Sequence, residues 1–253
     1  MNEIISVITA SYNSEKTISN TLDSLINQTN KNFEFILIDG NSKDSTLKIV
    51  KQYEQAFHQK GINFKWISEQ DSGIYAAWNK GLKMVKGEWV SFLGSDDILM
   101  PTAIDDYSNL IQNQSSKPID LIHSKVEVVK NNKVIKVIDG LWSWKIFKNH
   151  MNIAHVGALH NMKYFNTYGV FDESYKITGD YELLLRAKDQ LKCLYLDKVT
   201  AQMAYGGIST TNERKVFLET LRAKRETAQV NALICWFDFY IALFKFKIKN
   251  VIN

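Results

Sequence analysis

The chain has 253 residues and a net charge of +4, and its apolar fraction of 45% is enough to form a folded core, which excludes a disordered chain. The lysines and arginines are scattered along the sequence, which argues against a nucleic-acid-binding protein. Cys193 and Cys235 match no metal or redox spacing, no signal peptide is recognised, and no run of about 18 apolar residues predicts a membrane span, so we expect a cytoplasmic protein.

The first 98 residues alternate between strand and helix patterns. Short apolar runs predict strands at residues 4–10, 33–38, 64–67 and 89–93. Helical periodicity lies between them, at residues 14–28, 45–59 and 75–85, and Gly87 is expected to cap the last of these helices. This alternation predicts an α/β fold with a mostly parallel sheet flanked by helices.

The second half of the chain is less regular. The patterns predict a helix at 104–112, a hairpin turning at Asn131-Asn132, a helix at 181–188, short strands at 194–196 and 199–203, and a helical tail from about Glu213. The simplest division is one domain at 1–212, with halves at 1–98 and 99–212, followed by a C-terminal tail at 213–253.

Polar residues follow several of the predicted strands. Asp96 and Asp97 come directly after the fourth strand, and Asp39 follows the second. Because the carboxyl ends of parallel strands meet at one edge of a sheet, where ligands bind, we expect these residues to converge. A hard divalent cation bound to phosphate oxygens needs one or two such carboxylates. The alternative is that Asp96 or Asp97 caps the helix that starts near Pro101.

Two other residues at this edge are open to two interpretations. Asp39 can accept hydrogen bonds from a base or ribose, or can be a turn aspartate satisfied by local amides. Lys80 can reach a phosphate, or can be a solvated lysine on a helix. The sequence has neither the Gly-rich turn of a dinucleotide-binding fold nor a Gly-x-x-x-x-Gly-Lys loop, which excludes these two nucleotide-binding classes.

Five short motifs occur in a characteristic order. They are Thr9-Ala10-Ser11-Tyr12-Asn13, the run from Ile38 to Thr46, Asp71-Ser72-Gly73-Ile74-Tyr75, Trp78-Asn79-Lys80-Gly81 and Gly94-Ser95-Asp96-Asp97. In this order they resemble the family-2 glycosyltransferases of bacterial polysaccharide synthesis, which have a GT-A fold. The resemblance extends over residues 1 to about 210.

This resemblance implies inverting transfer of a sugar from a UDP-sugar, with Mn²⁺ or Mg²⁺, to a hydroxyl of a glycan or lipid-linked oligosaccharide. The product would belong to a capsule, lipopolysaccharide O-antigen or exopolysaccharide. Carried over by position, Asp97 would be the metal ligand and Asp96 would meet the ribose. The other nucleotide-binding residues implied in this way are Thr9, Ala10, Tyr12, Asp39, Asp71, Gly73, Lys80 and Ser95.

The resemblance also implies a catalytic base. Asp180, in Thr178-Gly179-Asp180-Tyr181-Glu182, matches an acidic residue that opens a helix below the acceptor pocket; related enzymes often have Ala in place of Gly179. The alternatives are that Asp180 only stabilises the start of this helix, or that Glu182 is the base. His155, Glu182 and Gly207 are expected to contact the acceptor or the diphosphate. The alternatives are that His155 is a structural histidine and that Gly207 belongs to a simple turn.

The tail combines aromatic residues between Trp236 and Phe246 with Lys245, Lys247 and Lys249. This composition predicts peripheral contact with the inner face of the membrane. The alternative is a helix that packs on the domain or on a second subunit of a homodimer. Two rival functions are a non-catalytic nucleotide-sugar-binding scaffold and a sugar nucleotidyltransferase; the second would need a Gly-rich, basic loop where Ser11-Tyr12-Asn13-Ser14 stands.

Overall fold

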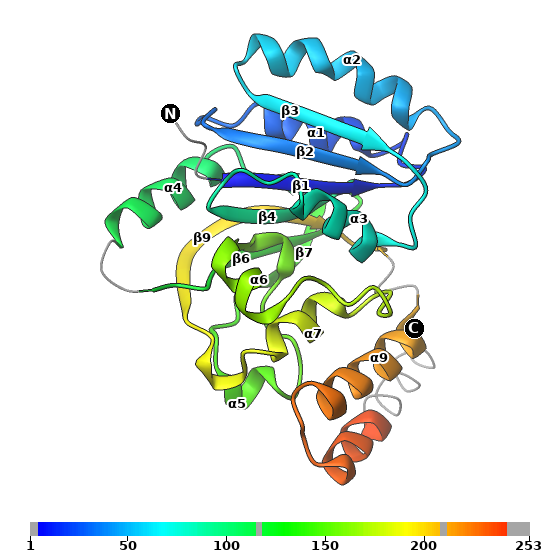
Figure 1. Cartoon of the computed structure of the whole chain (residues 1–253), viewed down its shortest axis with the longest axis vertical. Coiled ribbons are helices and arrows are strands. Elements are labelled where there is room, and N and C mark those ends of the chain that lie inside the picture. Colours follow the sequence, from blue (N-terminus) through cyan, green and yellow to red (C-terminus); the bar gives the residue numbers. More distant parts are fainter. Residues whose placement is uncertain (1–4, 115–117, 208–211, 242–253) are drawn as a thin grey trace.

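A computed structural model describes residues 5–114, 118–207 and 212–241 of the chain. In this part of the chain, nine strands form one curled, mixed sheet in the order β3-β2-β1-β4-β8-β6-β9-β5, with β7 paired to β6 (Figure 1). The strands are β1 Ile5–Ser11, β2 Phe33–Asp39, β3 Asn63–Ser68, β4 Trp89–Gly94, β5 Ile98–Leu99, β6 Leu121–Lys130, β7 Lys133–Ile138, β8 Ala158–Asn161 and β9 Cys193–Ala204.

The helices lie on both faces of this sheet (Figure 1). They are α1 Ile18–Ile26, α2 Thr46–Gln59, α3 Ile74–Leu82, α4 Ala103–Asn113, α5 Trp144–Phe147, α6 Met162–Tyr168, α7 Gly179–Leu185 and α9 Glu213–Glu226, with short 3-10 turns η1 His155–Gly157 and η2 Lys188–Gln190. Residues 232–241 form a further helical segment. Among the described residues, no helix is both long enough and apolar enough to cross a bilayer.

The predicted α/β sheet is confirmed, and its parallel part is formed by the first half of the chain. Strands β3, β2, β1 and β4 are all parallel, with Ser11 opposite Asp39 and Asp39 opposite Ser68. Alternate residues of these strands point to opposite faces and enter two separate core clusters, one with Ile8 and Ile36 and the other with Val7 and Phe35. The carboxyl ends of the four strands therefore lie along one edge.

Two local predictions are wrong. Gly87 does not cap α3, which ends at Leu82; it precedes β4, where a Cβ would come within 2.6 Å of Ser6 Oγ. The two short strands expected after residue 193 are one strand, β9, because the pairing with β6 steps from Leu196 to Val199 through a bulge rather than a turn. The predicted hairpin is confirmed, with Asn131 and Asn132 at φ 49° and 60°.

The helix α9 packs beside α7, and in Figure 1 α9 lies in the half of the molecule away from α2. Ala223 and Ala228 belong to the same core cluster as Ile8 of β1. Residues 242–253, with the lysines of the predicted membrane-contact tail, lie outside the described residues. The described part of the tail is thus connected to the core of the domain.

Candidate active site

Asp39, at the end of β2, is fully buried. Its Oδ1 accepts hydrogen bonds from the hydroxyls of Ser11 (3.1 Å) and Ser42 (2.5 Å), and its Oδ2 from Ser42 N (2.9 Å) and Ser68 Oγ (2.7 Å). Three of these four donors are hydroxyls, which can rotate and release the carboxylate to a ligand. With these partners the carboxylate organises the turn that follows β2.

Asp71 and Gly73 lie next to this turn. Asp71 Oδ1 accepts a hydrogen bond from Gly73 N (2.9 Å), and Asp71 Oδ2 lies 3.0 Å from the position of a Cβ on Gly40. Gly73 has φ 134°, which a residue with a side chain rarely adopts. Lys80 turns back to the same loop, with Nζ 2.9 Å from Glu69 Oε1 and 2.9 Å from Gln70 O.

The other residues implied for the nucleotide lie along β1 and the β4–β5 turn. The Tyr12 side chain is 63% exposed, so its ring is free to stack on a planar base. Ser95 Oγ lies 2.8 Å from Ser14 Oγ, which joins the two loops. Thr9 Oγ1 is buried without a hydrogen-bond partner among the described residues, and Ala10 is half-buried beside it.

Asp97 is buried and Asp96 is exposed at the β4–β5 turn. Asp97 Oδ2 accepts a hydrogen bond from Gly94 N (3.2 Å) and Oδ1 accepts one from Ala204 N (3.1 Å). Burial and the neighbouring charge of Asp96 raise the pKa of Asp97 to about 7. Thr102, not either aspartate, precedes α4, so the helix-cap alternative is excluded.

This pair fits a divalent cation that also binds a diphosphate. Mg²⁺ and Mn²⁺ bind through one or two protein carboxylates and complete their coordination with phosphate oxygens and water. The described residues contain no group of three or more His, Cys, Asp or Glu side chains that could hold a metal by themselves. A bound cation would therefore share its coordination with the substrate, and it would relieve the cost of burying Asp97 beside Asp96.

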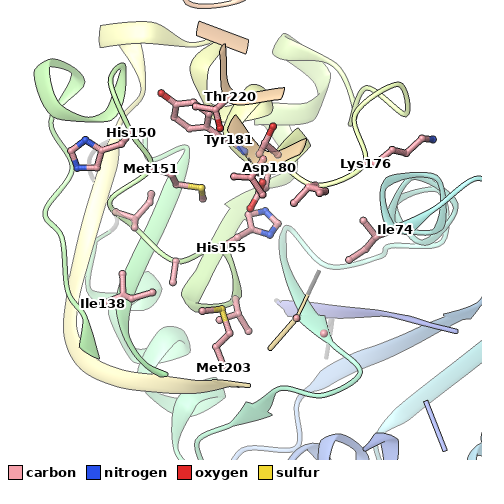
Figure 2. A pocket seen from close by; sticks show the side chains of 18 of the residues that line it. Ile74, Ile138, His150, Met151, His155, Lys176, Asp180, Tyr181, Met203 and Thr220 are labelled. Atoms are coloured by element: carbon pink, nitrogen blue, oxygen red, sulfur yellow. Dashed lines mark hydrogen bonds between the residues drawn. The ribbon is translucent and has the colours of Figure 1, made fainter. Parts of the chain in front are cut away.

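A cavity of about 690 Å³ connects these aspartates with the predicted base. Of the predicted site residues, Asp96, Asp97, His155, Asp180 and Gly207 line it. Figure 2 shows Asp180 and His155 projecting into the middle of the cavity, with apolar side chains of Ile138, Met151 and Met203 on one side. The structure thus brings together carboxylates that are more than 80 residues apart in the sequence.

Asp180 lies in the first turn of α7 and is partly buried. Its Oδ1 accepts hydrogen bonds from Tyr181 N (2.9 Å) and Tyr75 Oη (3.3 Å). Burial raises the pKa of Asp180 to about 6; these two hydrogen bonds oppose the shift and the charge of Glu219 adds to it. A carboxylate with a pKa of about 6 is ionised at neutral pH and is a stronger base than an ordinary aspartate.

The segment before Asp180 is fixed by residues of α3 that sequence reasoning did not assign to the site. Tyr75 Oη donates to Ile177 O (2.7 Å), and Asn79 Nδ2 donates to Phe171 O (2.9 Å). Both residues belong to motifs that follow β3 in the sequence, but the sequence shows only their types and not their partners about 100 residues away. These contacts join the segment before Asp180 to the half of the domain with Asp39.

His155 is buried among aromatic side chains. The centroid of its ring lies 5.2 Å from that of Phe92 and 5.1 Å from that of Trp78. Burial and the neighbouring His160 lower the pKa of His155 well below its usual value, so the ring is neutral. Its Nε2 and the Nε1 of Trp78 have no hydrogen-bond partner among the described residues, although both side chains line the cavity. Unpaired buried polar atoms at a cavity wall are candidates for ligand contacts.

The structure does not bring Glu182 to the cavity. Glu182 is buried and accepts hydrogen bonds from Arg186 Nε (3.0 Å) and Thr227 Oγ1 (2.9 Å). These contacts satisfy its charge on the side of α7 that faces α6 and α9, and it does not line the cavity around Asp180. Gly207 does line the cavity, whereas Ile208 and Ser209 of the same predicted loop lie outside the described residues.

We expect Gly179→Ala to destabilise the protein by about 1–3 kcal/mol, because overpacking strains a filled core. A Cβ at this position would lie 2.8 Å from Cε2 of Tyr75, whose ring packs on Phe171 with centroids 5.4 Å apart. Urea unfolding would measure the change. Gly207→Ala is the control, since no described atom lies within 4 Å of a Cβ there. Equal stability of the two variants would contradict the prediction.

The chain is similar to known proteins over most of its length. A family model described as glycosyl transferase family 2 matches residues 6–161, more than half of the chain. The PGL/p-HBAD biosynthesis glycosyltransferase of Mycobacterium tuberculosis is 27% identical over 228 residues, which cover 86% of this chain and 84% of the relative.

Two solved structures are similar to this fold. One is Staphylococcus aureus TarS 1-349 in complex with UDP, at a TM-score of 0.69 and 23% identity, covering 94% of this chain and 70% of that chain. The other is the mannosyltransferase PcManGT from Pyrobaculum calidifontis in complex with GDP-Man and Mn²⁺, at a TM-score of 0.60 and 15% identity, covering 97% and 75%. These likenesses show a GT-A fold.

Proposed function

The chain belongs to glycosyl transferase family 2, and from this premise we propose that it transfers a sugar, with inversion, from a UDP-sugar to a hydroxyl of a lipid-linked glycan in bacterial surface polysaccharide synthesis. The observation that carries the proposal is that Asp97 and Asp180 line one cavity. One carboxylate is suited to the diphosphate side of the donor, and the other to a proton on the acceptor. A non-catalytic scaffold would need neither in this arrangement.

In this reaction the acceptor oxygen attacks the anomeric carbon, the bond from that carbon to the phosphate oxygen breaks, and UDP leaves with the electron pair. We assign Asp180 to take the proton of the acceptor hydroxyl, because its pKa of about 6 keeps it ionised at neutral pH. Attack from the face opposite UDP inverts the anomeric centre. His155, neutral and with an unpaired Nε2, is placed to contact the sugar or diphosphate.

The nucleotide is assigned to the edge formed by the carboxyl ends of β1, β2 and β4. Support comes from the exposed ring of Tyr12, the buried carboxylate of Asp39 and the position of Asp71 over Gly40. The other residues assigned to it are Thr9, Ala10, Gly73, Lys80, Ser95 and Asp96. When bound, Mn²⁺ or Mg²⁺ held by Asp97 supplies a positive charge that stabilises the diphosphate as it leaves.

The acceptor side of the cavity favours a lipid-linked substrate over a free glycan. Its lining there is predominantly apolar and includes Val128, Ile138, Met151, Ile153, Met203 and Leu221. Sugar hydroxyls need hydrogen-bonding partners, and aliphatic walls leave them without any. Such walls bind the hydrocarbon or aromatic part that is attached to the reacting sugar.

The test is release of UDP from a panel of UDP-Glc, UDP-Gal, UDP-GlcNAc and UDP-GalNAc, with Mn²⁺ or Mg²⁺, in the presence of lipid-linked and free oligosaccharide acceptors. We expect one donor to be used much faster than the others, and faster with a lipid-linked acceptor. The stereochemistry of the product shows whether transfer inverts the anomeric centre. Donor binding without turnover on any acceptor would favour the scaffold instead.

We further propose that the helical segment 232–241 contacts the inner face of the membrane. Its inner side holds the buried Cys235, whereas Leu233, Phe237 and Tyr240 on its outer side are all more than 60% exposed. In the sequence, Lys245, Lys247 and Lys249 follow this apolar face, and anionic lipids attract lysines.

We expect Leu233→Ser/Phe237→Ser to weaken binding to phosphatidylglycerol vesicles at least about tenfold, because each side chain loses the free energy of leaving water. Co-sedimentation with vesicles measures this loss. Val134→Ser/Ile135→Ser, on the exposed strand β7, is the matched control. If the wild-type protein ignored vesicles and the tail variant changed only a monomer–dimer equilibrium, this face would be a subunit interface.

A further inference from the structure

Glu219 of α9 accepts hydrogen bonds from three consecutive backbone amides. Its Oε2 lies 3.1, 2.9 and 3.0 Å from the nitrogens of Lys176, Ile177 and Thr178, and its Oε1 lies 3.0 Å from Lys176 N. Hydrogen bonds from amides to a carboxylate are stronger than those to neutral acceptors. One side chain from a distant helix therefore fixes the chain immediately before the base.

The same segment is held from the opposite side by α3. Tyr75 Oη donates to Ile177 O, and Ile177 N donates to Glu219 Oε2. Both backbone polar groups of Ile177 are therefore held by side chains. Tyr75 also reaches Asp180 Oδ1. Because Asp180 follows Thr178 by two residues, a shift of residues 176–178 would move the carboxylate within the cavity.

A second contact of α9 allows the role of Glu219 to be separated from general docking of the helix. Arg222, one turn further along α9, donates to Ser174 Oγ (2.9 Å) and lies over the ring of Tyr175, 4.3 Å from its centroid. Arg222 thus binds the segment before the amides that Glu219 holds. Loss of either side chain would weaken the packing of α9, but only loss of Glu219 would free the amides next to the base.

We propose that Glu219 is a positioning residue for the transfer reaction: its carboxylate fixes the backbone of residues 176–178 and so orients Asp180 toward the acceptor hydroxyl. The proposal rests on the proposed function in taking Asp180 as the base. It makes α9 a working part of the active site, although its residues lie beyond the part that matches the family model.

The test compares Glu219→Ala, Glu219→Gln and Arg222→Gln in the full-length chain. We expect Glu219→Ala to lower the kcat of the donor-binding protein about 10- to 100-fold, since small misplacements of a catalytic group have effects of this size. The Kd for the donor should stay unchanged. Glu219→Gln keeps one acceptor oxygen and should fall between Glu219→Ala and wild type, and it serves alone if the alanine variant does not fold. Arg222→Gln should lower the Tm but change kcat less than twofold.

Chemical rescue and hydrogen exchange complete the test. In Glu219→Ala, acetate can occupy the vacated position, so it should restore part of kcat and slow the amide exchange of residues 176–178, which the variant accelerates. A kcat within twofold of wild type, equal losses in Arg222→Gln, or exchange that neither the variant nor acetate alters would overturn the proposal. If the wild-type enzyme transferred no sugar, the proposed function would fail, while the exchange measurements would still decide whether Glu219 holds this segment.

Discussion

Asp180→Asn is expected to lower the rate of sugar transfer by about 10²- to 10⁴-fold, which is the range of contributions from a general base. The amide has the same shape, and its oxygen can still accept the hydrogen bonds from Tyr181 N and Tyr75 Oη, but it cannot take a proton. Donor affinity should stay within about twofold, because Asp180 lies on the acceptor side of the cavity. Steady-state transfer rates and calorimetric binding of the UDP-sugar measure the two effects separately.

The pH dependence gives a second measurement of the same assignment. Since the pKa of Asp180 is about 6, the fraction of ionised base rises as the pH rises through 6. At saturating donor and cation, kcat of the wild-type enzyme should therefore increase about tenfold per pH unit below 6 and level off above it. The residual activity of Asp180→Asn should lack this step. A wild-type profile without it, or near-normal rates in the variant, would remove Asp180 from the role of base.

Stability distinguishes loss of chemistry from loss of structure. The folded-state pKa of Asp180 is raised, so the folded protein binds the proton more tightly than the unfolded chain, and ionisation at higher pH opposes folding. Asp180→Asn should thus raise the free energy of unfolding at pH 8 by up to about 3 kcal/mol, and this gain should shrink as the pH falls from 6 toward 4. Asp189→Asn, at an exposed position, should show neither effect.

The parallel half of the sheet could be predicted because its signal is local. Each of its strands is a short apolar run, and the turns after them contain the polar residues that end up at the ligand-binding edge. The hairpin at Asn131-Asn132 was predictable for a similar reason, since asparagine tolerates the positive φ that both residues adopt. In each case the residues that determine the structure are neighbours in the sequence.

The parts that the sequence did not reveal depend on distant contacts. Glu182 and Asp180 are both acidic and two residues apart, but α7 turns Glu182 toward Arg186 and Thr227 and leaves Asp180 in the cavity. The role of Glu219 depends on amides 41 to 43 residues earlier in the chain. Gly87 resembled a helix cap because it follows a helical pattern, whereas its small size is needed for contact with Ser6. No local pattern contains these partners.

Asp97→Ala is expected to lower metal-dependent transfer at least about 100-fold, because it would remove the carboxylate through which the cation is held against the diphosphate. Titration of Mn²⁺ into the protein with UDP present should show that the cation-dependent part of UDP affinity is lost, whereas Asp189→Ala should retain it. Asp97→Ala also leaves the backbone amides of Gly94 and Ala204 without their acceptor, which should lower the stability by about 1–3 kcal/mol. Activity is therefore compared at a temperature where both variants are folded. Wild-type transfer that is unchanged in excess EDTA would exclude the cation from the reaction and leave Asp97 as a residue that joins β9 to the β4–β5 turn.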